Sequence, residues 1–347
     1  MSVPAVLRPT RRNLWLWYVA AMGVLTVCYM AVPPLKGYAV VINIIGFTSP
    51  VAIFVAMRMH KPKAQLAWYL LMIGQLLYFA GDFYTYTYPD LLGGTVGFPS
   101  LGDAIYLSVY PALVGGLLLL VRRRNPATDR AASIDSVILT VGFALLSWIF
   151  LVAPNAHLSG LSPLAKGVSV AYPLGDILLL AAVIRLAVDA GKRAPAFYLL
   201  VASIVSILAT DCAYNYALLK GTYNHQLIYD LGWIAYLVLW GAAALHPSMR
   251  TLEEPAVHSR SRLTRMRLAL LALACLIAPG IHFSQDIHNM DVLVVIAASA
   301  GLFLLVVARM AGLVRQEERA TGRELALRRA GVALVAAAGQ EQVNAAV

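Results

Sequence analysis

The sequence predicts an all-α, polytopic membrane protein with about ten transmembrane helices, and three observations lead to this fold class. Of its 347 residues, 60% are hydrophobic and 13% are charged, with a mean hydropathy of +0.74. The apolar residues form long unbroken runs, and a bilayer core of about 30 Å takes about 20 helical residues per crossing. The alternating segments of about ten residues that mark an outer-membrane barrel are absent from the sequence. Helices are therefore expected, because a helix satisfies its own backbone hydrogen bonds within lipid.

Ten apolar runs are long enough to cross the membrane. The first follows a basic segment and lacks the small-residue cleavage site of a signal peptide, so we interpret it as a retained helix. The predicted spans cover residues 14–33, 38–58, 65–88, 101–121, 132–153, 165–187, 196–218, 227–246, 266–284 and 291–312.

The basic residues predict the orientation of these spans. The net charge of +10 comes from Lys and Arg residues in short loops between the apolar runs. They collect at the N-terminal end and in every second loop, as the positive-inside rule expects of cytoplasmic segments. We therefore expect a multi-pass protein of the bacterial inner (plasma) membrane, with both termini cytoplasmic, membrane lipid as its surroundings and no nucleic acid as a partner.

A pattern in the third and fourth spans recurs in the seventh and eighth. Residues 68–71 (Trp-Tyr-Leu-Leu) begin fourteen positions before Asp82, and residues 197–200 (Phe-Tyr-Leu-Leu) begin fourteen positions before Asp211. The two copies lie four spans apart, so they share one orientation in the membrane. An internal duplication with parallel repeats is the interpretation that this register favours.

The next apolar run also begins in the same way in both copies. Asp103 opens it in the first copy and Asp230 opens it in the second, 127 residues later. The duplication predicts two parallel four-helix repeats plus a terminal helix pair and a cytoplasmic C-terminal helix. The expected units are membrane repeat 1 at 1–130, membrane repeat 2 at 131–262, the terminal pair at 263–313, and at 314–347 a signalling helix leading into a possible output domain.

The C-terminal segment differs in composition from the rest of the chain. Residues 315–329 are charged and rich in helix formers, so the last span is expected to continue as a cytoplasmic helix. Apolar residues recur there every seven positions, which indicates a short coiled coil and a homodimer through this helix. A solvated helical tail is the alternative. The heptad positions are Leu313, Ala320, Leu327 and Leu334.

Acids and aromatic residues gather at the outer ends of the predicted spans. A carboxylate within a span costs about 2.5–3.5 kcal/mol on insertion scales and normally faces a cavity or a partner. The alternatives are an interfacial aromatic belt for Tyr and Trp, and polar helix packing for the acids. The candidate ligand-binding residues of this outer-face pocket are Asp82, Tyr86, Asp103, Tyr106, Tyr172, Asp176, Asp211, Tyr214, Asp230 and Trp233.

Two further features are candidates for special chemistry. Pro173 lies within the sixth span next to Asp176, and a helix opened by this proline would line a pocket. His282, Asp286 and His288 lie together at the outer end of the ninth span and are candidate metal ligands. Their spacing matches no closed zinc pattern, and exposed loop histidines are the alternative.

The common catalytic and nucleotide-binding motifs are absent from the sequence. It contains no Walker A, HExxH, GxSxG or glycine-rich dinucleotide pattern, and no GGDEF or EAL motif. The sequence therefore names no catalytic residue and no cofactor.

Several short motifs, together with the ten-span layout, resemble the N-terminal membrane sensor regions of actinobacterial cyclic-di-GMP signalling proteins. These are Gly81-Asp82, residues 99–106 (Pro-Ser-Leu-Gly-Asp-Ala-Ile-Tyr), residues 172–176 (Tyr-Pro-Leu-Gly-Asp) and the tail at 327–337. In that family such a region precedes GAF or PAS modules and GGDEF or EAL output domains. The resemblance implies an output domain, acting as a diguanylate cyclase or phosphodiesterase in cis or in trans, which this chain does not contain.

These observations lead to one main functional hypothesis and two alternatives. The main hypothesis is a sensory module that detects an extracytoplasmic or membrane cue and passes it through the last helix to a cytoplasmic output domain. The first alternative is a secondary transporter or channel for a small solute, with the same acids along its path. The second is a membrane-embedded enzyme of the outer face, with an aspartate such as Asp82 or Asp211 as its base.

Overall fold

The computed structural model describes residues 13–31, 38–124, 130–188, 193–223, 227–254 and 289–346. Within these ranges the chain is helical and contains no strand. The predicted fold class, an all-α polytopic membrane protein, is confirmed.

Nine of the described helices are long and apolar enough to cross a membrane, and each corresponds to one predicted span. The predicted span at 266–284 lies outside the described residues. The nine helices are α1 (Leu14–Ala31), α2 (Tyr38–His60), α3 (Gln65–Asp82), α5 (Leu101–Arg124), α6 (Arg130–Ser147), α8 (Pro163–Val188), α9 (Pro195–Leu219), α10 (Leu227–Leu245) and α12 (Asn289–Ala346).

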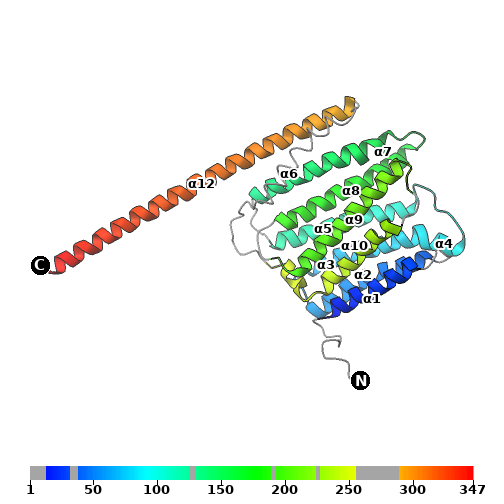
Figure 1. Cartoon of the computed structure of the whole chain (residues 1–347), viewed down its shortest axis with the longest axis horizontal. Helices are drawn as coiled ribbons and strands as arrows, with labels where there is room; N and C mark the ends of the chain where they lie inside the picture. The colour runs from blue at the N-terminus through cyan, green and yellow to red at the C-terminus, as the bar shows by residue number, and fades with distance from the viewer. Residues whose placement is uncertain are drawn as a thin grey trace, which may run out of the picture.

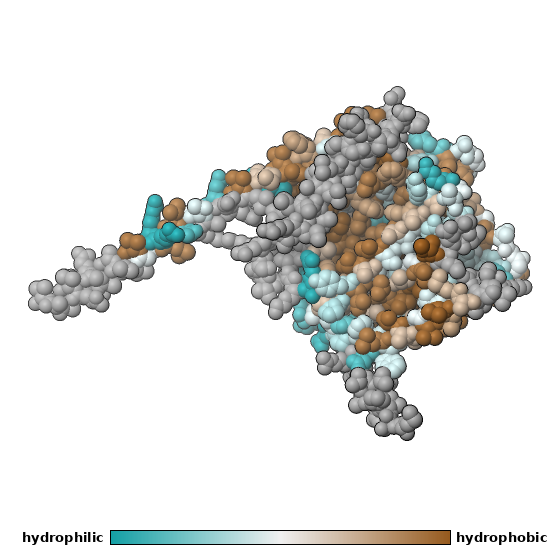
Figure 2. Space-filling view, viewed as in Figure 1, coloured by the Kyte–Doolittle hydropathy of each residue, from teal (hydrophilic) through white to brown (hydrophobic). Residues whose placement is uncertain are grey.

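The membrane helices run alongside one another, and their contacts define a clear order (Figure 1). Helix α5 packs between α3 and α8, while α10 packs against α1, α2 and α9. Helix α6 packs on α8, and α12 packs on α6 at the edge of the bundle. Figure 2 shows hydrophobic side chains across the body of the bundle, with hydrophilic ones nearer the two ends of the helices. This distribution suits a body surrounded by lipid.

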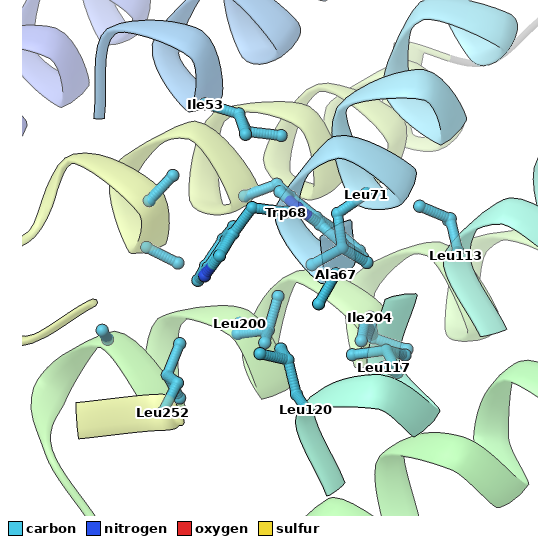
Figure 3. Packing of buried hydrophobic residues seen from close by; sticks show 14 of the residues in the cluster. Ile53, Ala67, Trp68, Leu71, Leu113, Leu117, Leu120, Leu200, Ile204 and Leu252 are labelled. Atoms are coloured by element: carbon cyan, nitrogen blue, oxygen red, sulfur yellow. The ribbon is translucent and has the colours of Figure 1, made fainter. Parts of the chain in front are cut away.

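Residues of the predicted repeated pattern lie in the main hydrophobic core of the bundle. Trp68 is fully buried and Phe197, its equivalent, is 3% exposed, while the next residue in each copy faces outward. Leu71 and Leu200 are both fully buried (Figure 3). Equivalent residues therefore occupy the same kind of environment, which fits the predicted duplication; the boundaries of the four-helix units stay a prediction.

Two of the spans contain a π-helical segment towards one end. Helix α3 continues into π-helix η2 (Phe83–Thr87) and then α4 (Tyr88–Leu92). Helix α6 continues in the same way into η3 (Trp148–Val152) and α7 (Ala153–His157). A π segment inserts an extra residue into the helical turn and changes the direction of the side chains that follow. In α3 this change comes directly after Asp82.

The expectation that Pro173 opens its helix is wrong. Helix α8 runs from Pro163 to Val188 with Pro173 inside it. The proline still removes one backbone donor, so the carbonyl of Ser169, four residues earlier, has no intrahelical partner at that position. The loss of one bond is insufficient to break a helix that is packed between neighbours.

At the opposite end from the π segments, a short 3-10 helix closes the bundle. It is η4 (Pro247–Leu252), and the buried Glu253 follows it. One carboxylate oxygen of Glu253 accepts the backbone N–H of Lys63 at 2.6 Å, and the other accepts the N–H of Ala64. Ala64 is the N-cap residue of α3 and Lys63 precedes it, so their backbone N–H groups have no partner within the helix. Glu253 therefore caps α3 from a segment about 190 residues away in the chain.

Helix α12 is 58 residues long and leaves the bundle (Figure 1). Its span, Val292–Gly312, packs against α6, and the rest projects as a continuous helix. The predicted continuation of the last span as a helix is confirmed. Of the predicted heptad positions, the side chain of Leu327 is described and is 73% exposed.

Candidate ligand-binding site

The bundle encloses a large cavity at the end that carries the π segments. Its volume is about 1100 Å³, slightly above the range of about 300–1,000 Å³ that is typical of small-molecule sites. Helices α3, α5, α8, α9 and α10 supply most of its walls, and residues 96–98 and Ser100 contribute from the loop before α5. All ten candidate ligand-binding residues line this one cavity; their role in binding stays a prediction. They are Asp82, Tyr86, Asp103, Tyr106, Tyr172, Asp176, Asp211, Tyr214, Asp230 and Trp233.

The charged groups on the cavity wall are all acidic. Each of the five main helices contributes one aspartate: Asp82 from α3, Asp103 from α5, Asp176 from α8, Asp211 from α9 and Asp230 from α10. Among the described residues of the lining there is no lysine, arginine or histidine. The described cavity wall therefore carries five carboxyl groups and no basic side chain to balance them.

Asp82 is held by donors from two other helices. It accepts hydrogen bonds from Asn43 Nδ2 of α2 at 2.6 Å and from the Tyr106 hydroxyl of α5 at 3.2 Å. Asn43 also donates to Thr87 Oγ1, the last residue of the π segment, at 2.6 Å. The π segment thereby brings Thr87 back towards Asn43, and the amide ties this turn to the aspartate.

Asp103 has a structural task at the start of α5. Its Oδ2 accepts the backbone N–H of Ser100 at 2.7 Å, while Ser100 Oγ accepts the N–H of Gly102 at 3.1 Å. This reciprocal arrangement is a capping box. The other oxygen, Oδ1, accepts the Tyr172 hydroxyl of α8 at 2.8 Å. Both oxygens of Asp103 are therefore occupied by protein donors.

Asp211 and Asp230 each accept a hydrogen bond from an aromatic side chain. Trp233 Nε1–H donates to Asp211 Oδ1 at 2.8 Å and joins α10 to α9. The Tyr29 hydroxyl donates to Asp230 Oδ2 at 2.8 Å and joins α1 to α10. These aromatic residues line the cavity and also orient its acids.

Asp176 differs from the other acids in one respect. Its Oδ1 accepts the Tyr110 hydroxyl of α5 at 2.9 Å. Its Oδ2 is buried without any hydrogen-bond partner, although the residue is only 2% exposed. Asp176 lies thirteen residues after Pro163, about 20 Å into a helix that rises 1.5 Å per residue. The cavity therefore extends to an acid deep in the span.

Tyr106 and Tyr110 contact Asp82 and Asp176 through the same packing arrangement. They lie four residues apart on α5, and each ring packs against a glycine that directly precedes the aspartate it binds. A Cβ on Gly81 would lie 3.0 Å from the Tyr106 ring, and one on Gly175 would lie 2.6 Å from the Tyr110 ring. The absent side chain makes room for the ring, whose hydroxyl then meets the next residue in the chain.

A cluster of aromatic rings adjoins the same cavity, and Tyr214, Tyr223 and Trp233 of this cluster line it. The Tyr214 ring makes edge-to-face contacts with Trp233 at 5.4 Å, Tyr223 at 5.1 Å and Tyr229 at 6.2 Å between centroids. Burial, together with the neighbouring Tyr214 and Asp230, raises the pKa of Tyr223 to about 12. This hydroxyl therefore stays neutral near pH 7.

The candidate metal ligands cannot be placed in this site. His282, Asp286 and His288 lie outside the described residues. Within the part of the chain that is described, no three His, Cys, Asp or Glu residues are grouped closely enough to hold a metal ion. The five cavity aspartates are thus spread over the wall.

A second polar feature, which the sequence analysis missed, joins α12 to the bundle. Arg309 of α12 forms a bidentate ion pair with Asp135 of α6, with Nε 2.6 Å from Oδ1 and Nη2 3.3 Å from Oδ2. Both side chains are buried, with 5% and 0% exposure. In the sequence, this ion pair is indicated by an acidic residue within the predicted span 132–153 and an arginine within the predicted span 291–312. Asn43, the partner of Asp82, is a similar case of a polar residue within an apolar run.

Comparison with known protein families, with characterised proteins and with solved structures finds no match for this chain.

Proposed function

We propose that the chain is a transmembrane sensory module in which the acidic cavity receives a ligand and α12 carries the response out of the membrane. The observation that carries this proposal is the course of α12. One continuous helix spans the bundle edge and then projects well beyond it, which gives a packing change inside the membrane a rigid route outward.

A chain of contacts links the cavity to that helix. Asp176 lies on α8, α8 packs against α6, and α6 holds α12 through the Asp135–Arg309 pair. A ligand that prefers one arrangement of these helices over another shifts the balance between them. The expected motions are helix translations of about 1–2 Å, which is the usual scale for such shifts.

In this proposal the protein lies in a bacterial plasma membrane with both termini in the cytoplasm and the cavity towards the outer side. The alternation of basic loops supports this orientation. The projecting part of α12 exposes Leu325, Leu327 and Val332, which supports contact with a second copy or with a cyclic-di-GMP output domain in cis or in trans.

The experiment uses two spin labels and a mimic of cavity occupancy. The labels are placed at Leu178 of α8 and Met310 of α12, which are 58% and 54% exposed, after Cys28, Cys212 and Cys275 have been replaced by serine. The distance between the labels is measured by double electron–electron resonance in lipid nanodiscs.

Ser169→Trp places an indole at a position of α8 that lines the cavity. Leu164→Trp adds the same group to an exposed position of the same helix, outside the lining, and is the control. We expect Ser169→Trp to move the mean distance by about 1–2 Å and Leu164→Trp to leave it unchanged. Equal distances in both variants would contradict the sensory proposal.

One observation favours transport as a second candidate function. Asp176 lies deep in its span, and secondary transporters place their substrate sites near the middle of the bilayer. Uptake of a cationic solute into proteoliposomes, retained after removal of residues 314–347, would favour transport over sensing.

A further inference from the structure

We propose that the cavity binds a small organic amine in its protonated form, and that the free oxygen of Asp176 accepts a hydrogen bond from the ammonium group. This inference names the ligand class of the proposed sensory site, and so rests on that function for its biological meaning. The binding itself is tested separately.

The carboxyl groups of the cavity wall favour a positively charged ligand. Five helices each contribute a carboxylate, and the described lining contains no basic side chain to balance them. Asp176 and Asp211 both line the cavity, from α8 and α9, two helices that are in contact. In a poorly screened site a carboxylate attracts a cation strongly, whereas an anion would meet only groups of its own sign.

The unpartnered oxygen of Asp176 favours a ligand that donates a hydrogen bond. Tyr110 occupies Oδ1 at 2.9 Å, whereas Oδ2 is buried and unpartnered. Buried polar atoms are almost always hydrogen-bonded, because an unsatisfied one loses its bonds to water without replacement. Asp82 and Asp103, in contrast, each have protein donors on both carboxylate oxygens. Among the described residues, Asp176 is therefore the cavity acid with a buried oxygen that lacks a partner, and an N–H of an amine supplies the missing bond.

The size of the cavity and its aromatic and aliphatic lining favour an organic ligand. The cavity of about 1100 Å³ is far larger than a metal ion, and no cluster of metal ligands exists among the described residues. Aromatic faces attract cations, and Tyr110, Tyr172 and Trp233 line the cavity beside the acids. Its deep part is lined by Leu113, Leu179, Ile207 and Leu237. A ligand with an ammonium group and an apolar body meets all of these surfaces.

Isothermal titration calorimetry on the full chain in detergent tests this inference with four related probes. Phenethylamine carries the ammonium group and the apolar body. Its trimethylated form keeps the charge but has no N–H, phenethyl alcohol has no charge, and phenylacetate has the opposite charge. Phenethylamine is expected to bind most tightly, the trimethylated form and the alcohol more weakly, and phenylacetate without detectable heat. Tryptamine and putrescine extend the set of amines in size and shape.

Asp176→Asn removes the charge and turns part of the group into a donor. It is expected to weaken phenethylamine binding about thirtyfold or more, as for the loss of one member of a buried charge pair. Asp90→Asn removes an acid outside the cavity lining and is expected to leave the affinity unchanged. Asp211→Asn is the second cavity variant, used in the same way if Asp176→Asn does not yield folded protein.

Three results would overturn the inference. They are equal affinity for phenethylamine and phenethyl alcohol, unchanged affinity in the cavity variants, and no binding of any of the three amines at millimolar concentration. Failure of this inference and failure of the sensory proposal are distinguishable. If the amine binds but Ser169→Trp leaves α12 in place, the sensory proposal fails and the amine site is retained. If no amine binds but Ser169→Trp moves α12, the sensory proposal is retained with a ligand of another class.

Discussion

Asp103 and Asp176 show at the residue scale how neighbours determine the role of a side chain. Both lie on the cavity wall and both accept a tyrosine hydroxyl. Asp103 also binds a backbone N–H at the start of its own helix, so its second oxygen serves the fold. The second oxygen of Asp176 has no partner. The same residue type is thus a helix cap in one place and an open acceptor in the other.

Gly175→Ala tests the packing that orients Asp176. The added methyl would lie 2.6 Å from the Tyr110 ring, so the ring must move and its hydrogen bond to Asp176 is disturbed. We expect the free energy of unfolding to fall by about 1–3 kcal/mol, the usual cost of overpacking. A denaturant titration in detergent micelles measures it.

Gly167→Ala is the matched control on the same helix, because a Cβ there meets nothing within 4 Å. An alanine gains up to about 1 kcal/mol of helix propensity over glycine, so this variant is expected to be equally or more stable than the wild type. If both variants behave alike, the close packing of Tyr110 on Gly175 does not matter to the fold.

The element scale concerns how helices far apart in the sequence are fixed to one another. Helix α12 contacts α6 through a small apolar cluster that includes Ile138, Leu145, Val295 and Leu302. The Asp135–Arg309 pair is the charged part of the same contact. Two charges within a membrane bundle are tolerated because they are paired, and the pair fixes the register of one helix against the other.

Asp135→Asn leaves Arg309 buried without its counter-charge. Removing one partner of a buried pair costs about 3–5 kcal/mol, and we expect a loss of this size in the free energy of unfolding. Replacing both residues, Asp135→Asn with Arg309→Gln, is expected to cost less than the single change. A double variant as unstable as the sum of its single variants would show that the two charges do not depend on each other.

Glu253→Ala tests the cap that closes the opposite end of the bundle. The change leaves the N–H groups of Lys63 and Ala64 without their acceptor, at an expected cost of about 1–3 kcal/mol in unfolding free energy. Glu254→Ala is the control, because Glu254 is exposed and lies next in the chain. Equal stability of the two variants would exclude a capping role for Glu253.

At the scale of the whole molecule, the sequence predicted the fold class and nine described spans, because long apolar runs determine membrane helices almost by themselves. All ten candidate residues line the cavity, since an aspartate such as Asp82 near the end of an apolar run is costly in lipid, but Tyr29, Tyr78 and Tyr223 also line it and were not predicted. The sequence did not predict which oxygen is free, because Tyr110 meets Asp176 across 66 residues of sequence. The π segment after Asp82 and the Asp135–Arg309 pair also depend on how helices pack.

The predicted duplication bears on the arrangement of the cavity acids. Each predicted copy brings one acid from the second half of its first helix and another from near the start of the next, and all four line one cavity. Asp176 comes from α8, outside the matched pattern. The cavity thus combines four aspartates at matching positions of the two predicted repeats with a fifth, Asp176, that has no matching residue. The unpartnered oxygen belongs to Asp176.

The coupling between the cavity and α12 is tested most directly by repeating the Leu178–Met310 distance measurement in two backgrounds. Ser169→Trp is introduced into the otherwise wild-type chain and into the variant with Asp135→Asn and Arg309→Gln. We predict that filling the cavity moves α12 by about 1–2 Å in the first background and leaves it in place in the second, because the pair transmits the movement of α6. The same shift in both backgrounds, or in neither, would contradict this coupling.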